Sequence, residues 1–272
     1  MSIFAQKWHT TRDAKNSVLF AGVDPAHAQM RDKNVLPDDV STRDWCLGYI
    51  QAVAPHVAGI KCNPAYFQSQ QGLQLLGELV AYARSLGLIT MADIKASDIG
   101  STNDAWFFSY AQLGFDSVTI APYAGNIESS VADAHERNLA AFTMGLMSNP
   151  EYQTEMHFTD GAHKLFDARI RRSIEAGADG IVVGATYEKE DPSFQTLLAL
   201  TKDTETLYLV PGIGAQGGTI ESFFNTGIEP RRCLLNIGRA LMFPDGMRST
   251  HEAQKHAALH YKELAAGYLL GV

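Results

Sequence analysis

The sequence predicts one closed (β/α)8 TIM barrel that occupies residues 1–272 as a single domain. Eight short apolar runs with turn residues at their ends recur along the chain, and segments of helical periodicity lie between them. Polar side chains suited to chemistry follow these runs consistently, as they do at the catalytic end of such barrels. A doubly wound open sheet is the alternative, but no Gly-x-Gly-x-x-Gly turn follows the first run.

The expected elements begin with a short helix over Ile3–Trp8, which we place across the barrel end opposite the active side. Gly72–Leu86 has an apolar stripe at helical spacing and stops at Gly87, a residue that favours the left-handed close of a helix. Two longer segments, Pro25–Val40 and Asn149–His163, are expected to be loops on the active side. The eight expected strands are Val18–Gly22, Val57–Ile60, Leu88–Met91, Ser117–Ala121, Leu139–Leu146, Gly180–Val183, Leu207–Val210 and Leu234–Ile237.

The composition limits the class of protein. A net charge of -8 argues against nucleic-acid binding, which needs a basic surface. No apolar run has the length of a membrane span, and the N-terminal residues lack the apolar core of a signal peptide. Cys46, Cys62 and Cys233 form no paired spacing, which is typical of reduced thiols. We therefore expect a cytoplasmic protein with neither a nucleic-acid nor a membrane partner.

The most informative segment is the heptad Asp93-Ile94-Lys95-Ala96-Ser97-Asp98-Ile99, which follows the expected strand Leu88–Met91. Side chains alternate along a strand, so Asp93 and Lys95 should point to the same side. Burying charge at a strand end is costly, and such clusters are kept mostly where the charge takes part in chemistry. The alternative is a solvated ion pair at the strand end.

Two glycine-containing turns indicate a phosphate site. The stretch from Pro211 to Gly218 follows the seventh expected strand, and glycine lets backbone amides approach an anion closely. The turn Gly238-Arg239 follows the eighth strand and adds a guanidinium that can bind phosphate in a bidentate manner. Because the loops after strands seven and eight of such barrels frequently form a phosphate site, we expect an anionic ligand here.

With these motifs in place, the chain resembles the orotidine 5′-monophosphate decarboxylase family over nearly its whole length, in the longer bacterial-type branch. The family signature D-x-K-x-x-D-I-x-x-T is complete, and both the Met-Ser-Asn-Pro turn and the loop with Gln216 are similar to the family pattern. The matching residues are Asp24, Lys61, Asp93, Lys95, Asp98, Thr102, Ser148, Gln216, Gly238 and Arg239.

The resemblance implies decarboxylation of orotidine 5′-monophosphate to UMP, the last step of de novo pyrimidine synthesis, with no metal and no cofactor. It implies that Lys95 delivers a proton to C6 of the pyrimidine, while Asp93 faces the substrate carboxylate and pairs with Lys61. Asp98 and Thr102 are implied to reach into the site of the neighbouring subunit, so the active unit would be a homodimer.

The same resemblance assigns the contacts to the rest of the nucleotide. Asp24 and Lys61 are implied to hold the ribose hydroxyls, and Ser148 to contact the pyrimidine ring. Gln216 and the Gly238-Arg239 turn are implied to bind the phosphate.

Two other functions remain open at this stage. A metal-dependent sugar-phosphate decarboxylase or lyase of the same superfamily would share the D-x-K-x-x-D core, and a phosphate-binding barrel without catalysis would share the glycine loops. His256 and His260 have the spacing of metal ligands on a helix, but no third ligand is evident, and we interpret them as a solvated helix face.

Overall fold

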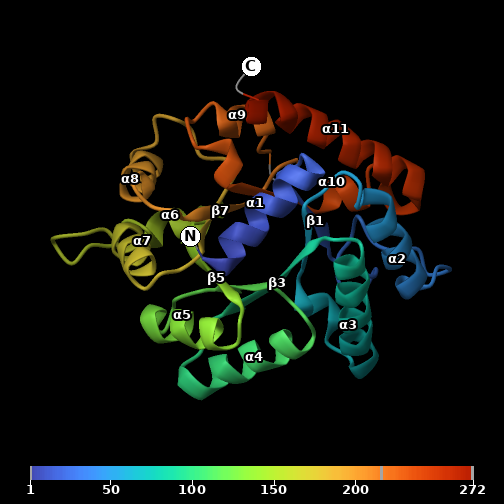
Figure 1. Cartoon of the computed structure of the whole chain (residues 1–272), viewed down its shortest axis with the longest axis horizontal. Coiled ribbons are helices and arrows are strands. Elements are labelled where there is room, and N and C mark those ends of the chain that lie inside the picture. The colour runs from blue at the N-terminus through green and yellow to red at the C-terminus, as the bar shows by residue number, and fades with distance from the viewer. Residues whose placement is uncertain (1, 215–216, 271–272) are drawn as a thin grey trace.

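The computed structural model describes residues 2–214 and 217–270, and its strands close into the expected barrel. All neighbouring strands are parallel and follow one another in chain order, and the eighth pairs back onto the first. Figure 1 shows this ring of strands with helices around it. The strands are β1 Leu19–Val23, β2 Gly59–Cys62, β3 Ile89–Ala96, β4 Ser117–Ile120, β5 Ala140–Leu146, β6 Gly180–Val183, β7 Leu207–Pro211 and β8 Cys233–Ile237.

The outer layer consists of helices that follow the strands. Their apolar faces pack against the sheet and leave almost every strand residue buried, which is why the strands read as continuous apolar runs. The helices are α1 Ile3–Lys15, α2 Thr42–Val53, α3 Gln70–Ser85, α4 Gly100–Gln112, α5 Ile127–Glu136, α6 Pro150–Glu155, α7 Leu165–Glu175, α8 Pro192–Thr201, α9 Ile220–Phe224, α10 Arg239–Met242 and α11 His251–Leu270, with short 3-10 turns η1 Pro64–Phe67, η2 Pro230–Arg232 and η3 Gly246–Arg248.

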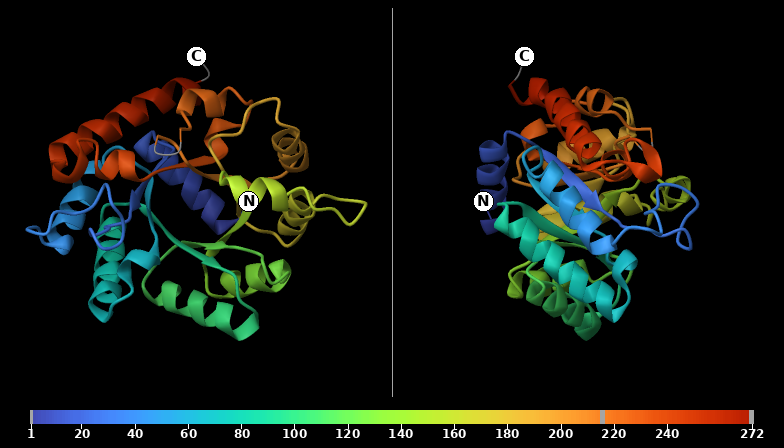
Figure 2. Two further views of the ribbon diagram at one scale, coloured as in Figure 1. Left: turned by 180° about the vertical axis from the view of Figure 1, so that it is seen from behind. Right: turned by 90° about the vertical axis from the view of Figure 1, so that its right-hand side faces the viewer.

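Helix α1 lies across the N-terminal ends of the strands (Figures 1 and 2). The Ser2 hydroxyl caps it by accepting from the Ala5 amide at 3.2 Å, and Asn16 ends it in a left-handed conformation. The fully buried Trp8 and the edge-on contact of Phe4 with Phe142 of β5 close this end of the barrel. The expected helix over Ile3–Trp8 is therefore present but extends to Lys15, because the apolar residues of its second half are too sparse to signal it.

The two long segments on the opposite side differ from each other. Residues 25–40 form an irregular loop, as expected, which Figure 2 (right view, blue) shows at the end of the barrel away from α1. The segment Asn149–His163, expected to be a loop throughout, contains the short helix α6. Pro150 at the first helical position and Asn149 before it are the signals that identify this start.

Strand β3 is irregular at its carboxyl end. Its register with β4 shifts between Ala92 and Ala96, and Lys95 has a φ angle of 49°. A non-glycine residue rarely adopts this left-handed conformation, and such strain clusters at functional sites. The barrel therefore departs from regular geometry at the lysine of the heptad.

Candidate active site

A cavity of about 550 Å³ opens at the carboxyl ends of the strands, on the side opposite α1. This volume suits a ligand of nucleotide size. The structure brings seven of the ten site residues expected from the sequence into its lining, and places Asp98 and Thr102 elsewhere. Gln216 lies outside the described residues. The seven are Asp24, Lys61, Asp93, Lys95, Ser148, Gly238 and Arg239.

The Asp93 carboxylate lies between two lysine ammonium groups. Lys61 Nζ donates to Oδ2 at 2.6 Å, and Lys95 Nζ lies 2.7 Å from Oδ1. The Lys61 and Asp93 side chains are only 6% and 13% exposed, whereas that of Lys95 is 45% exposed. Asp93 and Lys61 are thus a buried, neutralised pair, and Lys95 presents its ammonium to the cavity.

The pKa shifts follow from this arrangement. Burial acts to raise the pKa of Asp93, but the charges of Lys61 and Lys95 outweigh it and hold that pKa well below its usual range. Burial acts to lower the pKa of Lys61, but the carboxylates of Asp93 and Asp24 outweigh it and raise that pKa. Asp93 and Lys61 therefore remain charged across the neutral range, although both are buried.

Thr119 of β4 completes this cluster and was not expected from the sequence. Its hydroxyl donates to Asp93 Oδ1 at 2.9 Å and accepts from the Lys95 amide at 2.9 Å. The side chain is fully buried. One hydroxyl therefore fixes both the orientation of the carboxylate and the strained backbone of Lys95. The expected strand Ser117–Ala121 contained Thr119 but gave no signal that its hydroxyl serves the site.

Asp24 marks another part of the cavity, at the end of β1. Its Oδ1 accepts from the Asn63 amide at 3.1 Å, which ties the β1 and β2 ends together. The second carboxylate oxygen is available to a ligand hydroxyl in the cavity. Asn236 Oδ1 of β8, also in the lining, is buried without a hydrogen-bond partner among the described residues. It is a second acceptor that the sequence did not reveal.

Ser148 follows β5 and is placed by close contact with the end of β6. A side chain at Gly184 would put its Cβ 2.8 Å from the Ser148 Cβ, so only glycine allows this approach. Met144 and Met147 line the cavity beside it. This wall presents a hydroxyl within an apolar surface, which suits one face of a planar heterocycle.

The β7 and β8 ends line the part of the cavity where the sequence predicts a phosphate site. Gly212 and Gly214 have left-handed φ angles of 108° and 77°. The amides of Gly214 and Gly218 donate to carbonyls of the same loop, at 2.8 and 3.3 Å. The exposed Arg239 lies at the start of α10 and lines the cavity. In this conformation the Arg239 guanidinium is available to bind an anion, whereas those two amides are not.

Asp98 and Thr102 lie outside the main cavity and are exposed. Asp98 lines an adjoining cavity of about 350 Å³, which shares Asp93 and Lys95 with the main one. The nearly fully buried Asn103 holds the Asp98 backbone by bonds of 3.2 and 2.7 Å. The segment after β3 is therefore well supported, although its carboxylate does not contact Lys95 within the chain.

His256 and His260, interpreted above as a solvated helix face, both lie on α11. In residues 2–214 and 217–270, no three His, Cys, Asp or Glu side chains gather in a way that would hold a metal ion. His256 lies on α11, where it pairs with Glu252 at 3.0 Å and is 68% exposed.

The described part of the chain also contains no helix with the length and apolar character needed to cross a membrane.

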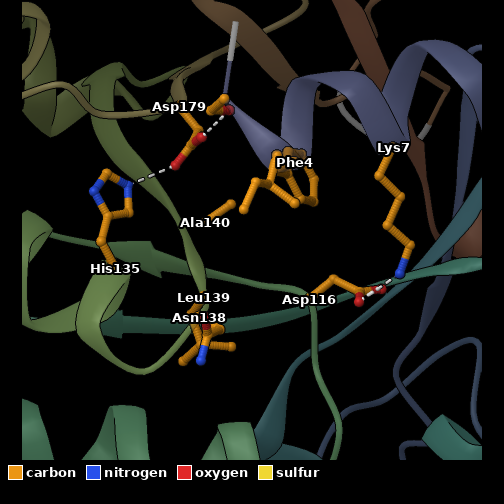
Figure 3. A pocket seen from close by; sticks show the side chains of 10 residues that line it. Phe4, Lys7, Asp116, His135, Asn138, Leu139, Ala140 and Asp179 are labelled. Atoms are coloured by element: carbon orange, nitrogen blue, oxygen red, sulfur yellow. Dashed lines mark hydrogen bonds and ion pairs between the residues drawn. The ribbon is translucent and has the colours of Figure 1, made fainter.

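A separate cavity of about 290 Å³ lies under α1, at the N-terminal ends of β4 to β6 (Figure 3). Asp179 accepts from the Ser2 hydroxyl at 2.5 Å, from His135 Nε2 at 2.8 Å and from the Ala141 amide at 3.0 Å. Lys7 of α1 pairs with Asp116 at 2.6 Å on the other side. These contacts fasten α1 to the barrel, and the cavity holds none of the expected site residues.

Comparison with known proteins places this geometry in one family. Residues 38–242 match the model of the Orotidine 5'-phosphate decarboxylase / HUMPS family. An orotidine 5'-phosphate decarboxylase of Nocardioides sp. is 32% identical over 76% of this chain and 80% of its own, and one of Dehalococcoides mccartyi is 27% identical over 96% and 98%. A crystal structure of a putative orotidine 5'-phosphate decarboxylase from Streptomyces avermitilis covers 99% of this chain and 98% of its own, with a TM-score of 0.79 and 26% identity.

Proposed function

The chain belongs to the Orotidine 5'-phosphate decarboxylase / HUMPS family, and we propose that it converts orotidine 5'-monophosphate to UMP with release of carbon dioxide. This step ends de novo pyrimidine nucleotide synthesis. The observation that carries the proposal is the row of charges Lys61, Asp93 and Lys95 at the floor of a nucleotide-sized cavity. Such a row is expensive to bury and has a direct use in this reaction.

The chemistry requires stabilisation of a carbanion. When the bond between C6 and the carboxylate breaks, the electron pair stays on C6 and carbon dioxide leaves. The ring offers that pair little delocalisation, so a fixed positive charge beside C6 is the main source of stabilisation. In the proposed mechanism the Lys95 ammonium supplies that charge and then donates its proton to C6, which gives UMP.

Asp93 has two roles in this proposal. It orients Lys95 through the 2.7 Å ion pair, and its charge lies against the carboxylate of the bound substrate. Repulsion between the two carboxylates is relieved as carbon dioxide departs, a ground-state contribution that adds to the electrostatic stabilisation of the transition state. The depressed pKa of Asp93 keeps it ionised for this purpose.

The remaining contacts bind the parts of the nucleotide that do not react. We assign the ribose hydroxyls to Asp24 and Lys61 and the pyrimidine to Ser148. The phosphate is assigned to the Gly238-Arg239 turn and to Gln216. Binding energy from phosphate and ribose can then be used to place C6 against Lys95.

We further propose that the active unit is a homodimer in which Asp98 and Thr102 serve the neighbouring site. Both residues are exposed in the single chain, and Asp98 lies in a cavity that opens onto Lys95. Ile99 and Trp106 beside them are 65% and 44% exposed, an apolar surface suited to a second copy. A carboxylate from that copy would flank Lys95 on the side away from Asp93.

The metal-dependent lyase is not favoured by these observations. The relatives compared above are named as decarboxylases of orotidine 5'-phosphate, and the Asp93 carboxylate of the site pairs with two lysines rather than with further metal-binding groups. A barrel that only binds phosphate has no use for the strained Lys95. A cytoplasmic location, which the three unpaired cysteines favour, is part of the proposal.

The test is turnover of orotidine 5'-monophosphate in EDTA, followed by loss of the orotate ultraviolet absorption. The wild-type protein should consume the substrate, and Lys95→Ala should not. Absence of turnover by folded wild-type protein would contradict the proposed function, and activity that appears only when magnesium is restored would point to the metal-dependent alternative.

A further inference from the structure

Arg31 lines the cavity although no feature of the sequence singled it out. It belongs to the irregular loop of residues 25–40, which follows β1. Its guanidinium carbon lies 5.7 Å from the ring centre of Tyr66 and 5.6 Å from that of Phe243. Tyr66 follows β2, and Phe243 ends the short helix that Arg239 begins. Arg31 is therefore held between the β2 and β8 ends, on the Arg239 side of the cavity.

The hydrogen bonds of Arg31 leave it free to bind an anion. Nε and Nη2 both donate to the Asn34 carbonyl of the same loop, the former at 2.8 Å. Among the described residues, no carboxylate forms an ion pair with Arg31. The Tyr66 and Phe243 rings lie against the guanidinium, whose remaining N–H donors point outward in its own plane. A positioned cation without a counter-charge is a group prepared for an anionic ligand.

The charge of the lining supports this interpretation. The cavity has four cationic side chains, Arg31, Lys61, Lys95 and Arg239, against the two carboxylates Asp24 and Asp93. The chain as a whole has a net charge of -8, so this excess is local. Lys61 and Lys95 are already paired with Asp93, which leaves Arg31 and Arg239 for the ligand. The nearby loop amides of Gly214 and Gly218 are occupied by carbonyls of their own loop.

We propose that Arg31 is a second phosphate-binding guanidinium, which contacts the phosphate of the nucleotide from the β1 loop, opposite Arg239. The inference rests on the proposed function for the identity of the nucleotide, but not for the presence of an anion. With Arg31 engaged, the 25–40 loop covers the phosphate from one side. Arg31 is thus a substrate-binding residue that sets the preference for phosphorylated ligands.

The experiment measures the affinities of UMP and uridine, which differ only by the phosphate, by calorimetry. Arg31→Ala should weaken UMP about 10- to 100-fold and leave uridine unchanged, as expected for loss of a charge-assisted bond. Lys33→Ala is the matched control, because it removes an exposed cation two residues away on the same loop. It should change neither affinity. Arg31→Lys, which keeps the charge but not the planar donor group, should lie between Arg31→Ala and the wild type.

The outcomes separate this inference from the proposed function. Equal weakening of UMP and uridine, or no change in either, would overturn the role of Arg31 while wild-type turnover kept the function intact. If the wild type fails to decarboxylate orotidine 5'-monophosphate, competition between inorganic phosphate and UMP still tests the anion site. The affinity for inorganic phosphate should be lower in Arg31→Ala than in the wild type. If Arg31→Ala does not fold, Arg31→Lys alone decides, because retention of the full ratio of UMP to uridine affinity would contradict a role for the planar guanidinium.

Discussion

The Thr119 hydroxyl donates to Asp93 Oδ1 at 2.9 Å, which couples a residue of β4 to the central carboxylate of the site. The Thr119 hydroxyl also accepts from the Lys95 amide, so Asp93 and Lys95 both depend on one neutral side chain. The Thr119 side chain is fully buried, and the contact needs no ligand. The charged cluster is thus organised before substrate arrives, which is what electrostatic catalysis requires.

Replacement of Thr119 should therefore impair catalysis more than binding. Thr119→Val keeps the shape of the side chain but removes both hydrogen bonds, and we expect kcat to fall about 10- to 100-fold with KM nearly unchanged. Thr119→Ser keeps the hydroxyl and should retain most of the activity. Steady-state kinetics on the three proteins make the comparison. Equal loss of kcat in the Val and Ser variants would contradict a specific role of the hydroxyl.

Mixing two inactive variants tests the shared site. Lys95→Ala and Asp98→Ala should each be nearly inactive as homodimers, because each lacks one charge of every site. A hybrid dimer has one site that lost both residues and one site that is intact, so random exchange should restore about one quarter of the wild-type sites. Activity is measured after subunit exchange, with hybrid formation verified by mass. Hybrids without recovered activity would show that Asp98 does not act across the interface.

Arg239 should contribute to the turnover of substrates that carry a phosphate and much less to that of substrates that lack one. Arg239→Ala is expected to reduce kcat/KM for orotidine 5'-monophosphate by about 100-fold, because a charge-assisted and potentially bidentate contact is lost. The phosphate-free nucleoside orotidine should be affected far less. Parallel kinetics on the two substrates provide the measurement. A similar loss on both would assign Arg239 to the structure of the β8 loop instead.

The contribution of the α1 contacts to the free energy of unfolding should depend on pH. The hydrogen bond with Asp179 raises the pKa of His135. Burial acts to raise the pKa of Asp179, but its bonds with His135, Ser2 and the Ala141 amide outweigh it and lower that pKa. Because the His135 pKa is raised, its contribution is complete below about pH 6.5 and is lost as pH rises through the folded value. The Asp179 contribution is present above about pH 3.9 and is lost as pH falls.

His135→Gln should consequently lower the free energy of unfolding more at pH 5.5 than at pH 8.5. The His135 side chain is 41% exposed, so solvent screening limits the difference to about 0.5 kcal/mol. His256→Gln is the control, since that histidine pairs with Glu252 on an exposed helix face. Urea denaturation at the two pH values measures both variants. An equal effect of His135→Gln at each pH would mean that its charge is not involved.

The sequence was sufficient for the strands but not for the local geometry of the site. Buried parallel strands are continuous apolar runs, so the expected strands overlap the observed ones, and Asp24, Lys61 and Asp93 fall at their carboxyl ends. Strict alternation, however, does not describe the end of β3, where the left-handed backbone of Lys95 sets its direction. Strain of this kind is imposed by tertiary contacts that no local pattern encodes.

Thr119 and Arg31 were missed for two different reasons. Thr119 is in an apolar run, where a threonine is an ordinary strand residue. Arg31 is in a long irregular loop, whose path over Tyr66 and Phe243 depends on packing between distant segments. The roles proposed for Asp98 and Thr102 would need an assembly of two chains, so neither the sequence pattern nor the single chain decides them.

The left-handed backbone at Lys95 has a consequence for engineering. Glycine adopts a φ of 49° without steric cost, so Lys95→Gly should raise the melting temperature as it abolishes turnover, and calorimetry would detect the rise. A melting temperature at or below that of the wild type would contradict this. Selection for heat resistance alone would thus drift away from lysine at this position. At this position stability and activity make opposing demands. The presence of lysine indicates that activity has been favoured over stability.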